Sequence, residues 1–105
     1  MDERARVLVV DDDVDILDAL TFMLEDDGYD VNTSDKATYA ESLPDTDESL
    51  PDLIVLDVLL SGKDGRTICQ KLKAAPRTRN VPVLMISAPP NARPSVVEAG
   101  ADAFL

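Results

Sequence analysis

The stretch VLVVDDD, residues 7–13, decides the fold of this chain. Four apolar residues run without a break into the three carboxylates Asp11, Asp12 and Asp13. A continuous apolar run of this kind is typical of a strand that is buried on both faces. Like charges at this spacing repel one another, and the repulsion costs more where water is partly excluded. Either a helix N-terminus, a cation or exposure of these side chains to solvent must therefore offset the repulsion.

Two further apolar runs end in polar residues. Residues 53–56 (LIVL) precede Asp57, and residues 83–86 (VLMI) precede Ser87. The whole pattern predicts strands at residues 6–10, 29–34, 53–58, 83–87 and 102–105, helices at 13–27, 35–43, 66–75 and 94–100, and a turn at 61–65. Strands and helices thus alternate along the chain. Buried parallel strands need helices on both faces, so the order predicts a doubly wound α/β sheet.

The boundaries of the predicted helices carry their usual signals. Asp12 or Asp13 can cap the first helix, and Gly28 stands where a left-handed stop is expected. Pro44 should end the second helix, because proline cannot continue one. Pro94 fits the first position of the last helix.

The polar residues at the strand ends should meet in space. In an open parallel sheet, ligands bind beyond the carboxyl ends of the strands, where the strand order reverses. Asp11, Asp12, Asp57 and Ser87 all follow predicted strands. Taken singly, each is explained as a helix cap, a turn residue or a hydroxyl bound to backbone. Together they form an oxygen-only ligand set, for which Mg²⁺ with retained waters fits best.

Composition excludes several classes of function. The net charge of −11 argues against nucleic acid or an anionic membrane as direct partners. The absence of histidine removes imidazole chemistry, and the single Cys69 excludes an internal disulfide. No apolar run approaches the ~18 residues of a membrane span, so we expect a cytoplasmic protein. The excess of aspartate over lysine, 16 against 4, resembles proteins of halophilic archaea.

Four segments carry a family resemblance that extends over essentially the whole chain. VLVVDDD (7–13), LIVLDVLLSGKDG (53–65), VLMISA (83–88) and EAGADAFL (98–105) resemble the receiver domain of two-component response regulators. The resemblance implies a flavodoxin-like fold with five parallel strands in the order 2-1-3-4-5. It also implies that Asp57 receives a phosphoryl group from the histidine of a sensor kinase. The implied Mg²⁺ ligands are Asp12, Asp57 and the backbone carbonyl of Leu59, with Asp11 acting through a bound water.

The resemblance further implies a conformational switch, in which Ser87 supplies the switch hydroxyl and Phe104 the switch aromatic ring. It implies no enzyme activity beyond the domain's own phosphorylation and dephosphorylation. The implied partners are a sensor histidine kinase and a downstream protein target that the sequence does not identify.

One departure from the family concerns the end of the chain. The family has a lysine, a proline and a fifth helix after the strand at residues 102–105, and this sequence ends at Leu105. We therefore expect residues 1–105 to form a receiver domain that is incomplete at its C-terminal end and lacks the fifth helix. A receiver-like scaffold that is not phosphorylated is the alternative function.

Two other readings of the acidic segment fit poorly. A phosphatase of the haloacid-dehalogenase type requires Thr or Val where Asp15 stands. A calcium-binding EF-hand loop requires Gly at Ile16 and Glu at Phe22.

Overall fold

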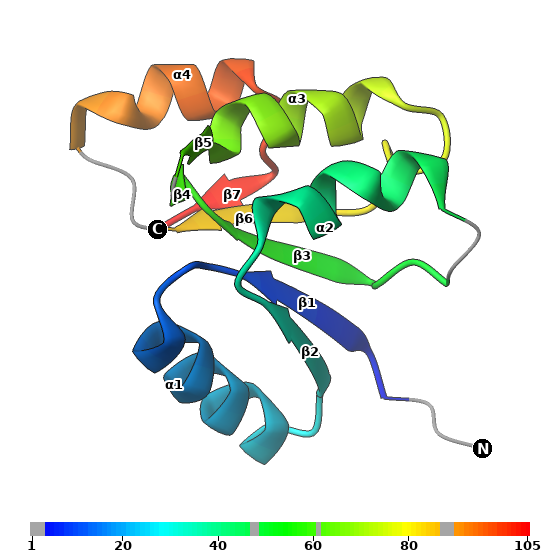
Figure 1. Cartoon of the computed structure of the whole chain (residues 1–105), viewed down its shortest axis with the longest axis vertical. Helices are drawn as coiled ribbons and strands as arrows, with labels where there is room; N and C mark the ends of the chain where they lie inside the picture. Colours follow the sequence, from blue (N-terminus) through cyan, green and yellow to red (C-terminus); the bar gives the residue numbers. More distant parts are fainter. Residues whose placement is uncertain (1–3, 47–48, 61, 87–89) are drawn as a thin grey trace.

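A five-stranded parallel sheet forms the middle layer of the molecule (Figure 1). The computed structural model describes residues 4–46, 49–60, 62–86 and 90–105. The sheet consists of β1 (Arg6–Val10), β2 (Asp30–Ser34), β3 (Leu53–Asp57), β6 (Val83–Ile86) and β7 (Ala103–Phe104). Their spatial order is β2-β1-β3-β6-β7, and every neighbouring pair is parallel. Counted along the chain, these five strands have the order 2-1-3-4-5, so the predicted fold class is confirmed.

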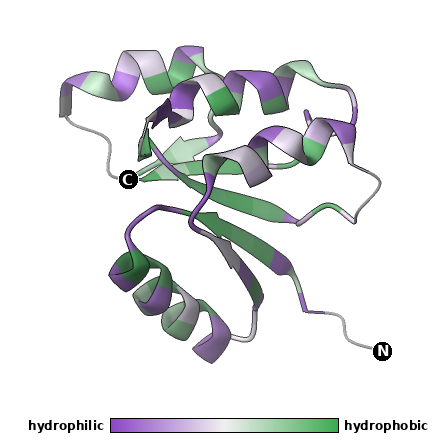
Figure 2. Ribbon diagram, in the orientation of Figure 1, coloured by the Kyte–Doolittle hydropathy of each residue, from purple (hydrophilic) through white to green (hydrophobic). Residues whose placement is uncertain are grey.

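Helices cover both faces of this sheet. The helix α1 (Val14–Asp26) lies on one face, and α2 (Ala37–Ser42), α3 (Gly65–Ala74) and α4 (Arg93–Glu98) lie on the other (Figure 1). Figure 2 shows that β1, β3 and β6 are mainly hydrophobic, whereas hydrophobic and hydrophilic residues are mixed along the helices on either side. Among the described residues, no helix is long and apolar enough to cross a membrane.

The central strands bury side chains on both faces, which explains their continuous apolar sequence. Val7, Val9 and Val55 form a small cluster with Leu17 of α1. The alternate residues of the same strands belong to a larger cluster on the opposite side. Its fully buried members include Val10, Leu43, Ile54, Leu56, Ile68, Leu72, Met85 and Val96. The two clusters hold β1 and β3 rigidly in place at the centre of the sheet.

The ends of α1 follow the predicted signals. The Asp13 carboxylate accepts hydrogen bonds from the backbone N–H groups of Asp15 (2.9 Å) and Ile16 (3.4 Å), so Asp13 is the N-terminal cap. The helix ends at Asp26, and Gly28 follows with a φ of 94°. Glycine adopts this left-handed conformation without the steric cost of a Cβ atom.

The segment predicted as a turn at 61–65 contains more structure than expected. Strand β4 (Leu59–Leu60) pairs antiparallel with β5 (Lys63–Asp64), and Gly62 has a φ of 71° between them. The prediction missed this hairpin because two-residue strands carry no periodic signal. The hairpin fixes the chain immediately after the end of β3.

The helix boundaries differ from the predicted ones by one or two residues, and two of them involve prolines. The second helix ends at Ser42, and Pro44 lies inside a following 3₁₀ turn, Leu43–Asp45. The last helix begins at Arg93, one residue before Pro94. Both prolines occupy the first turn of a helical segment, where no backbone N–H is needed as an intrahelical donor.

Gly65 lies unusually close to the backbone at the end of β3. Its N–H donates to the Val58 carbonyl oxygen at 2.8 Å, and a Cβ atom added at Gly65 would lie 2.0 Å from the Asp57 carbonyl oxygen. No side chain fits in that space. The start of α3 is therefore packed directly against the backbone of Asp57.

We expect Gly65→Ala to lower the free energy of unfolding by about 3 kcal/mol, because the added methyl group overpacks a rigid backbone contact. Gly28→Ala is the control, since a Cβ atom there meets nothing within 4 Å and adds only the strain of its positive φ. That strain costs about 1 kcal/mol. Urea unfolding of both variants makes the comparison, and an equal loss in the two would contradict the close packing of Gly65.

Candidate functional site

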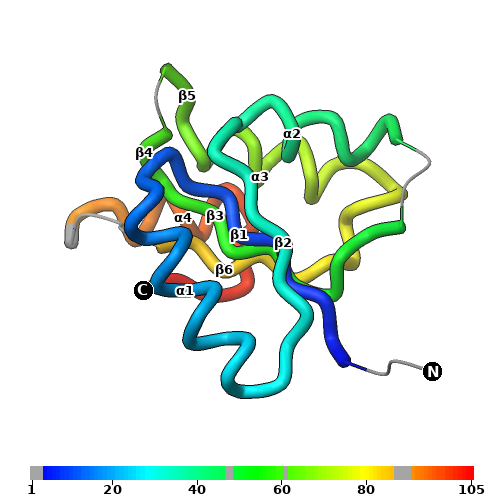
Figure 3. The backbone as a smooth tube through the Cα atoms, turned by 60° about the horizontal axis from the view of Figure 1, so that its bottom comes forward, coloured from blue at the N-terminus to red at the C-terminus, as the bar shows by residue number. Residues whose placement is uncertain are grey.

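Three carboxylates meet at the carboxyl end of the sheet. Asp11 follows β1 directly, Asp57 is the last residue of β3, and Asp12 is next to Asp11. One oxygen from each of the three lies within 4.8 Å of the others. Figures 1 and 3 show why, because β1 and β3 are neighbours that run in the same direction and emerge at one edge. The predicted meeting of these three side chains is therefore observed.

The backbone holds two of these carboxylates in fixed positions. The Asp11 N–H donates to the Ser34 carbonyl oxygen at 3.1 Å, which extends the pairing of β1 with β2. The Asp11 side chain accepts from the Asp13 N–H at 3.0 Å, and the Asp57 side chain accepts from the Leu59 N–H at 3.1 Å. Each carboxylate thus closes a local turn with the N–H two residues on.

Two of the three carboxylates are buried from solvent. The exposed fraction is 0% for Asp11 and 6% for Asp57, whereas Asp12 is exposed. The pKa of Asp57 is raised to about 6, mainly by burial and also by the neighbouring Asp11 and Asp12, against the opposing effect of the Leu59 N–H. The cluster is electrostatically unfavourable when all three side chains are charged.

One carboxylate oxygen of Asp11 indicates which kind of ligand fits the cluster. Its Oδ2 atom is buried and accepts no hydrogen bond within the described part of the chain. A buried acceptor without a partner costs free energy, and a second charge beside it adds repulsion. A hard divalent cation would satisfy the oxygen and offset the repulsion together, and Mg²⁺ prefers oxygen ligands of this kind. The donor set therefore fits Mg²⁺.

The other predicted site residues have different positions. Leu59 lies on β4 beside Asp57, with its side chain 61% exposed. Phe104 lies on β7, half-buried against the larger core cluster, with the Arg93 guanidinium 4.7 Å from the centre of its ring. Ser87 lies outside the described residues. The roles of Leu59, Ser87 and Phe104 stay predictions.

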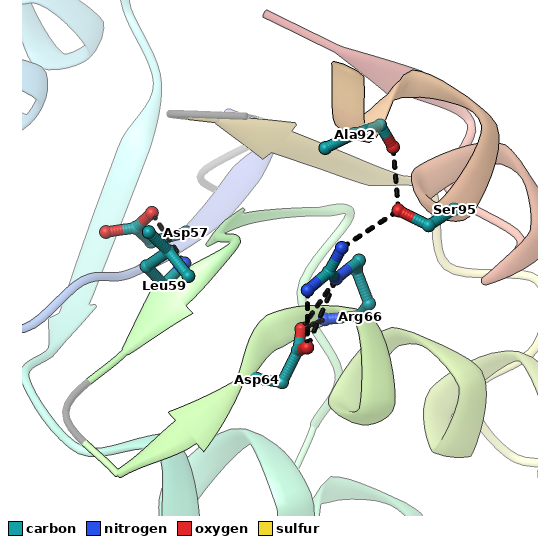
Figure 4. Close-up of polar contacts among 6 residues, drawn as sticks. All are labelled: Asp57, Leu59, Asp64, Arg66, Ala92 and Ser95. Atoms are coloured by element: carbon teal, nitrogen blue, oxygen red, sulfur yellow. Dashed lines mark hydrogen bonds and ion pairs between the residues drawn. The ribbon is translucent and has the colours of Figure 1, made fainter. Parts of the chain in front are cut away.

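A set of polar contacts beside the site was not predicted from the sequence. Hydrogen bonds join Arg66 of α3 to Asp64 at the end of β5 and to Ser95 of α4 (Figure 4). The sequence DGR at residues 64–66 indicates a helix cap followed closely by a basic residue. No sequence signal links Arg66 to Ser95, because they lie 29 residues apart.

The comparison with known proteins decides the family. The family model of the response regulator receiver domain matches residues 7–105. This chain belongs to the response regulator receiver domain family. Receiver domains bind Mg²⁺ at an acidic site, and this chain has an acidic cluster formed by Asp11, Asp12 and Asp57.

Individual relatives agree with this assignment. The chain is 37% identical over 102 residues to the DNA-binding dual master transcriptional regulator RpaA of Synechocystis, covering 95% of this chain and 42% of RpaA. It is 40% identical over 103 residues to the response regulator PleD of Caulobacter vibrioides, covering 96% of this chain and 22% of PleD. The receiver domain thus spans less than half the length of these relatives.

Solved structures share the fold. The crystal structure of a putative response regulator from Chloroflexus aurantiacus superposes with a TM-score of 0.88 at 32% identity, covering 98% of this chain and 84% of that one. The fold and the family of this chain are therefore the same as those of known response regulators.

The charge on Asp57 should make stability depend on pH when no divalent cation is present. The folded pKa of about 6 exceeds the ordinary value of 3.8, so folding takes up a proton between these two values. The Asp57 side chain thus contributes to the stability of the fold at low pH, and this contribution is lost as pH rises through the folded pKa. Between about pH 7 and about pH 5 the wild type should gain about 1 kcal/mol more than Asp57→Asn.

Urea unfolding in EDTA buffers measures this difference, and the comparison with Asp57→Asn removes the contribution of carboxylates remote from Asp57. The same pH dependence in the two proteins would show that Asp57 is not held in an unfavourable charged state.

Proposed function

We propose that this receiver domain accepts a phosphoryl group on Asp57 from the histidine of a sensor kinase, in a reaction that requires Mg²⁺. One observation carries the proposal: the nearly buried Asp57 carboxylate lies within 4.8 Å of Asp11 and Asp12. Such a site concentrates negative charge, and the exposed Asp12 places one side of it in contact with solvent.

The chemistry of the transfer follows from these groups. An oxygen of the Asp57 carboxylate attacks the phosphorus atom of the phosphohistidine. The P–O bond forms as the P–N bond breaks, and the electron pair stays on the imidazole nitrogen, which takes up a proton. The Leu59 N–H holds the attacking carboxylate in one orientation. Bound Mg²⁺ supplies the positive charge that offsets repulsion between the carboxylates and the phosphoryl oxygens.

We assign the ion to Asp12, Asp57 and the backbone carbonyl of Leu59, with Asp11 acting through a bound water. The unpartnered Oδ2 of Asp11 supports this assignment, because a metal-bound water donates hydrogen bonds. Asp13 has a different role, since its carboxylate caps α1.

The proposed partners follow from the same function. They are a sensor histidine kinase and a downstream protein, and the proposed location is the cytoplasm. The domain acts as a signalling switch and catalyses only its own phosphorylation and dephosphorylation. Its net charge of −11 argues against direct nucleic-acid contact by these residues. A receiver-like scaffold without phosphorylation is the other function we considered, and no observation favours it.

Incubation with acetyl phosphate and Mg²⁺ tests the proposal. We expect the intact mass to increase by one phosphoryl group, and this acyl phosphate should survive acid and be lost in base. Asp57→Asn should show no increase, because the amide nitrogen cannot replace the attacking carboxylate oxygen. A mass gain that persists in Asp57→Asn would place the phosphoryl group elsewhere, and no gain in the wild type would favour the scaffold.

The metal assignment is tested in the same assay. Asp12→Ala should slow phosphorylation at least about tenfold, because it removes a direct ligand of the ion. Asp13→Ala is the matched control, since it removes a neighbouring carboxylate that serves only as a cap. We expect it to phosphorylate at nearly the wild-type rate but to unfold about 1 kcal/mol more easily. Equal slowing in the two variants would overturn the ligand assignment.

A further inference from the structure

Two groups of polar contacts, one at Asp57 and Leu59 and one running from Asp64 to Ser95 in the first turn of α4 (Figure 4), are joined by the backbone pairing of β4 with β5. The connection passes through Leu59, Asp64 and Arg66 and ends at Ser95. These residues come from β3, β4, β5, α3 and α4. The elements that surround the acidic cluster are thus tied to a helix outside it.

The first step is the hairpin that follows Asp57. The Leu59 N–H donates to Asp57 Oδ1 at 3.1 Å, and Leu59 pairs with Asp64 across the β4–β5 ladder. The Gly65 N–H donates to the Val58 carbonyl oxygen, and Gly65 has no room for a Cβ atom. Any change in how the Asp57 carboxylate is bound therefore acts on the backbone that carries Asp64.

The second step is a bidentate ion pair between the Arg66 guanidinium and the Asp64 carboxylate, which we call the Arg66 fork. Asp64 accepts from Arg66 Nη2 at 2.7 Å and from Arg66 Nε at 2.9 Å, and it also accepts from the Arg66 backbone N–H at 2.9 Å. The remaining terminal nitrogen, Nη1, donates to Ser95 Oγ at 2.9 Å. Only a planar guanidinium can hold the carboxylate with two nitrogens and reach a third group with another.

The third step fixes α4 and Phe104. Ser95 Oγ donates to the Ala92 carbonyl oxygen at 2.8 Å, so its hydroxyl is held by both Arg66 and its own chain. Arg93, the next residue after Ala92, places its guanidinium 4.7 Å from the centre of the Phe104 ring. This distance is that of a cation–π contact. The same short segment is thus held by α3 and lies against Phe104.

Helix capping alone does not explain these contacts. Capping of α3 needs only the bond from the Arg66 backbone N–H to Asp64 Oδ1. It places no requirement on the Arg66 side chain and none on Ser95. The side chains of Arg66 and Asp64 are 32% and 41% exposed, so solvent only partly competes with the fork.

We propose that Arg66 is a positioning residue that links the occupancy of Asp57 to the position of α4 and of Phe104. The proposal rests on the proposed function, because the occupant of Asp57 is the phosphoryl group. Phosphorylation changes the acceptor of the Leu59 N–H, the hairpin carries the change to Asp64, and the Arg66 fork carries it to Ser95. This route is separate from any role of the Ser87 hydroxyl.

Fluorine NMR reads the two ends of this route. The chain has only two phenylalanines, so labelling with 4-fluorophenylalanine gives one resonance from Phe104 and a reference from Phe22, which is exposed on α1. The sample is treated with acetyl phosphate and Mg²⁺, and the mass gain is measured in parallel. Phosphorylated and free molecules interconvert slowly and give separate Phe104 resonances. Their separation can be read at any level of phosphorylation.

We expect Arg66→Lys and Ser95→Ala each to reduce this separation at Phe104 by half or more, with the mass gain still present. Lysine keeps the charge but cannot bridge Asp64 and Ser95 together. Ser95→Thr keeps the hydroxyl and should restore the wild-type separation. Lys71→Ala is the matched control, because it removes a positive charge and an ion pair to Glu41 from the same helix without touching α4.

Four results would overturn the inference. They are a wild-type separation in both Arg66→Lys and Ser95→Ala, an equal reduction in Lys71→Ala, failure of Ser95→Thr to restore the separation, and a phosphorylated wild type in which Phe104 does not shift. Absence of any mass gain in the wild type would instead contradict the proposed function, and the inference with it.

Discussion

Repulsion between carboxylates at the carboxyl edge of the sheet is the constraint on which the rest of this structure depends. Two aliphatic strands, β1 and β3, lie side by side in the core and deliver Asp11 and Asp57 to one point. Burial on both faces leaves these strands no freedom to move the charges apart. The fold therefore maintains an arrangement that is unfavourable without a cation, and the buried, unpartnered oxygen of Asp11 marks its cost.

The basic side chains of α3 contact neighbouring elements on one face of the sheet. Helix α3 uses Lys71 to reach Glu41 of α2, Lys73 to reach Asp102 before β7, and Arg66 to reach Ser95 of α4. Helix α1, on the other face, contains acidic residues and no lysine or arginine. α3 is thus the element that joins its neighbours through side chains, and it begins in direct contact with the Asp57 backbone. This position suits it to pass on changes at the acidic cluster.

The sequence predicts the parts that depend on local pattern. The aliphatic runs predict that the strands are parallel and buried, and the positions of Asp11 and Asp57 after these runs predict that they meet. The strand order is implied by the family resemblance. The cap at Asp13 and the stop at Gly28 also follow from residue type. The β4–β5 hairpin and the link from Arg66 to Ser95 do not follow, because they depend on side-chain and backbone geometry between distant segments. The halophilic origin suggested by the composition stays a prediction.

A double-mutant cycle on Asp11 and Asp57 tests the central claim most directly. Asp11→Asn, Asp57→Asn and the double variant are compared with the wild type by urea unfolding in EDTA near neutral pH. Each single change should stabilise the fold, and the double variant should gain less than the sum of the two by about 1 kcal/mol, since either change relieves the same repulsion. Gains that add fully, or single variants that are less stable than the wild type, would contradict the account.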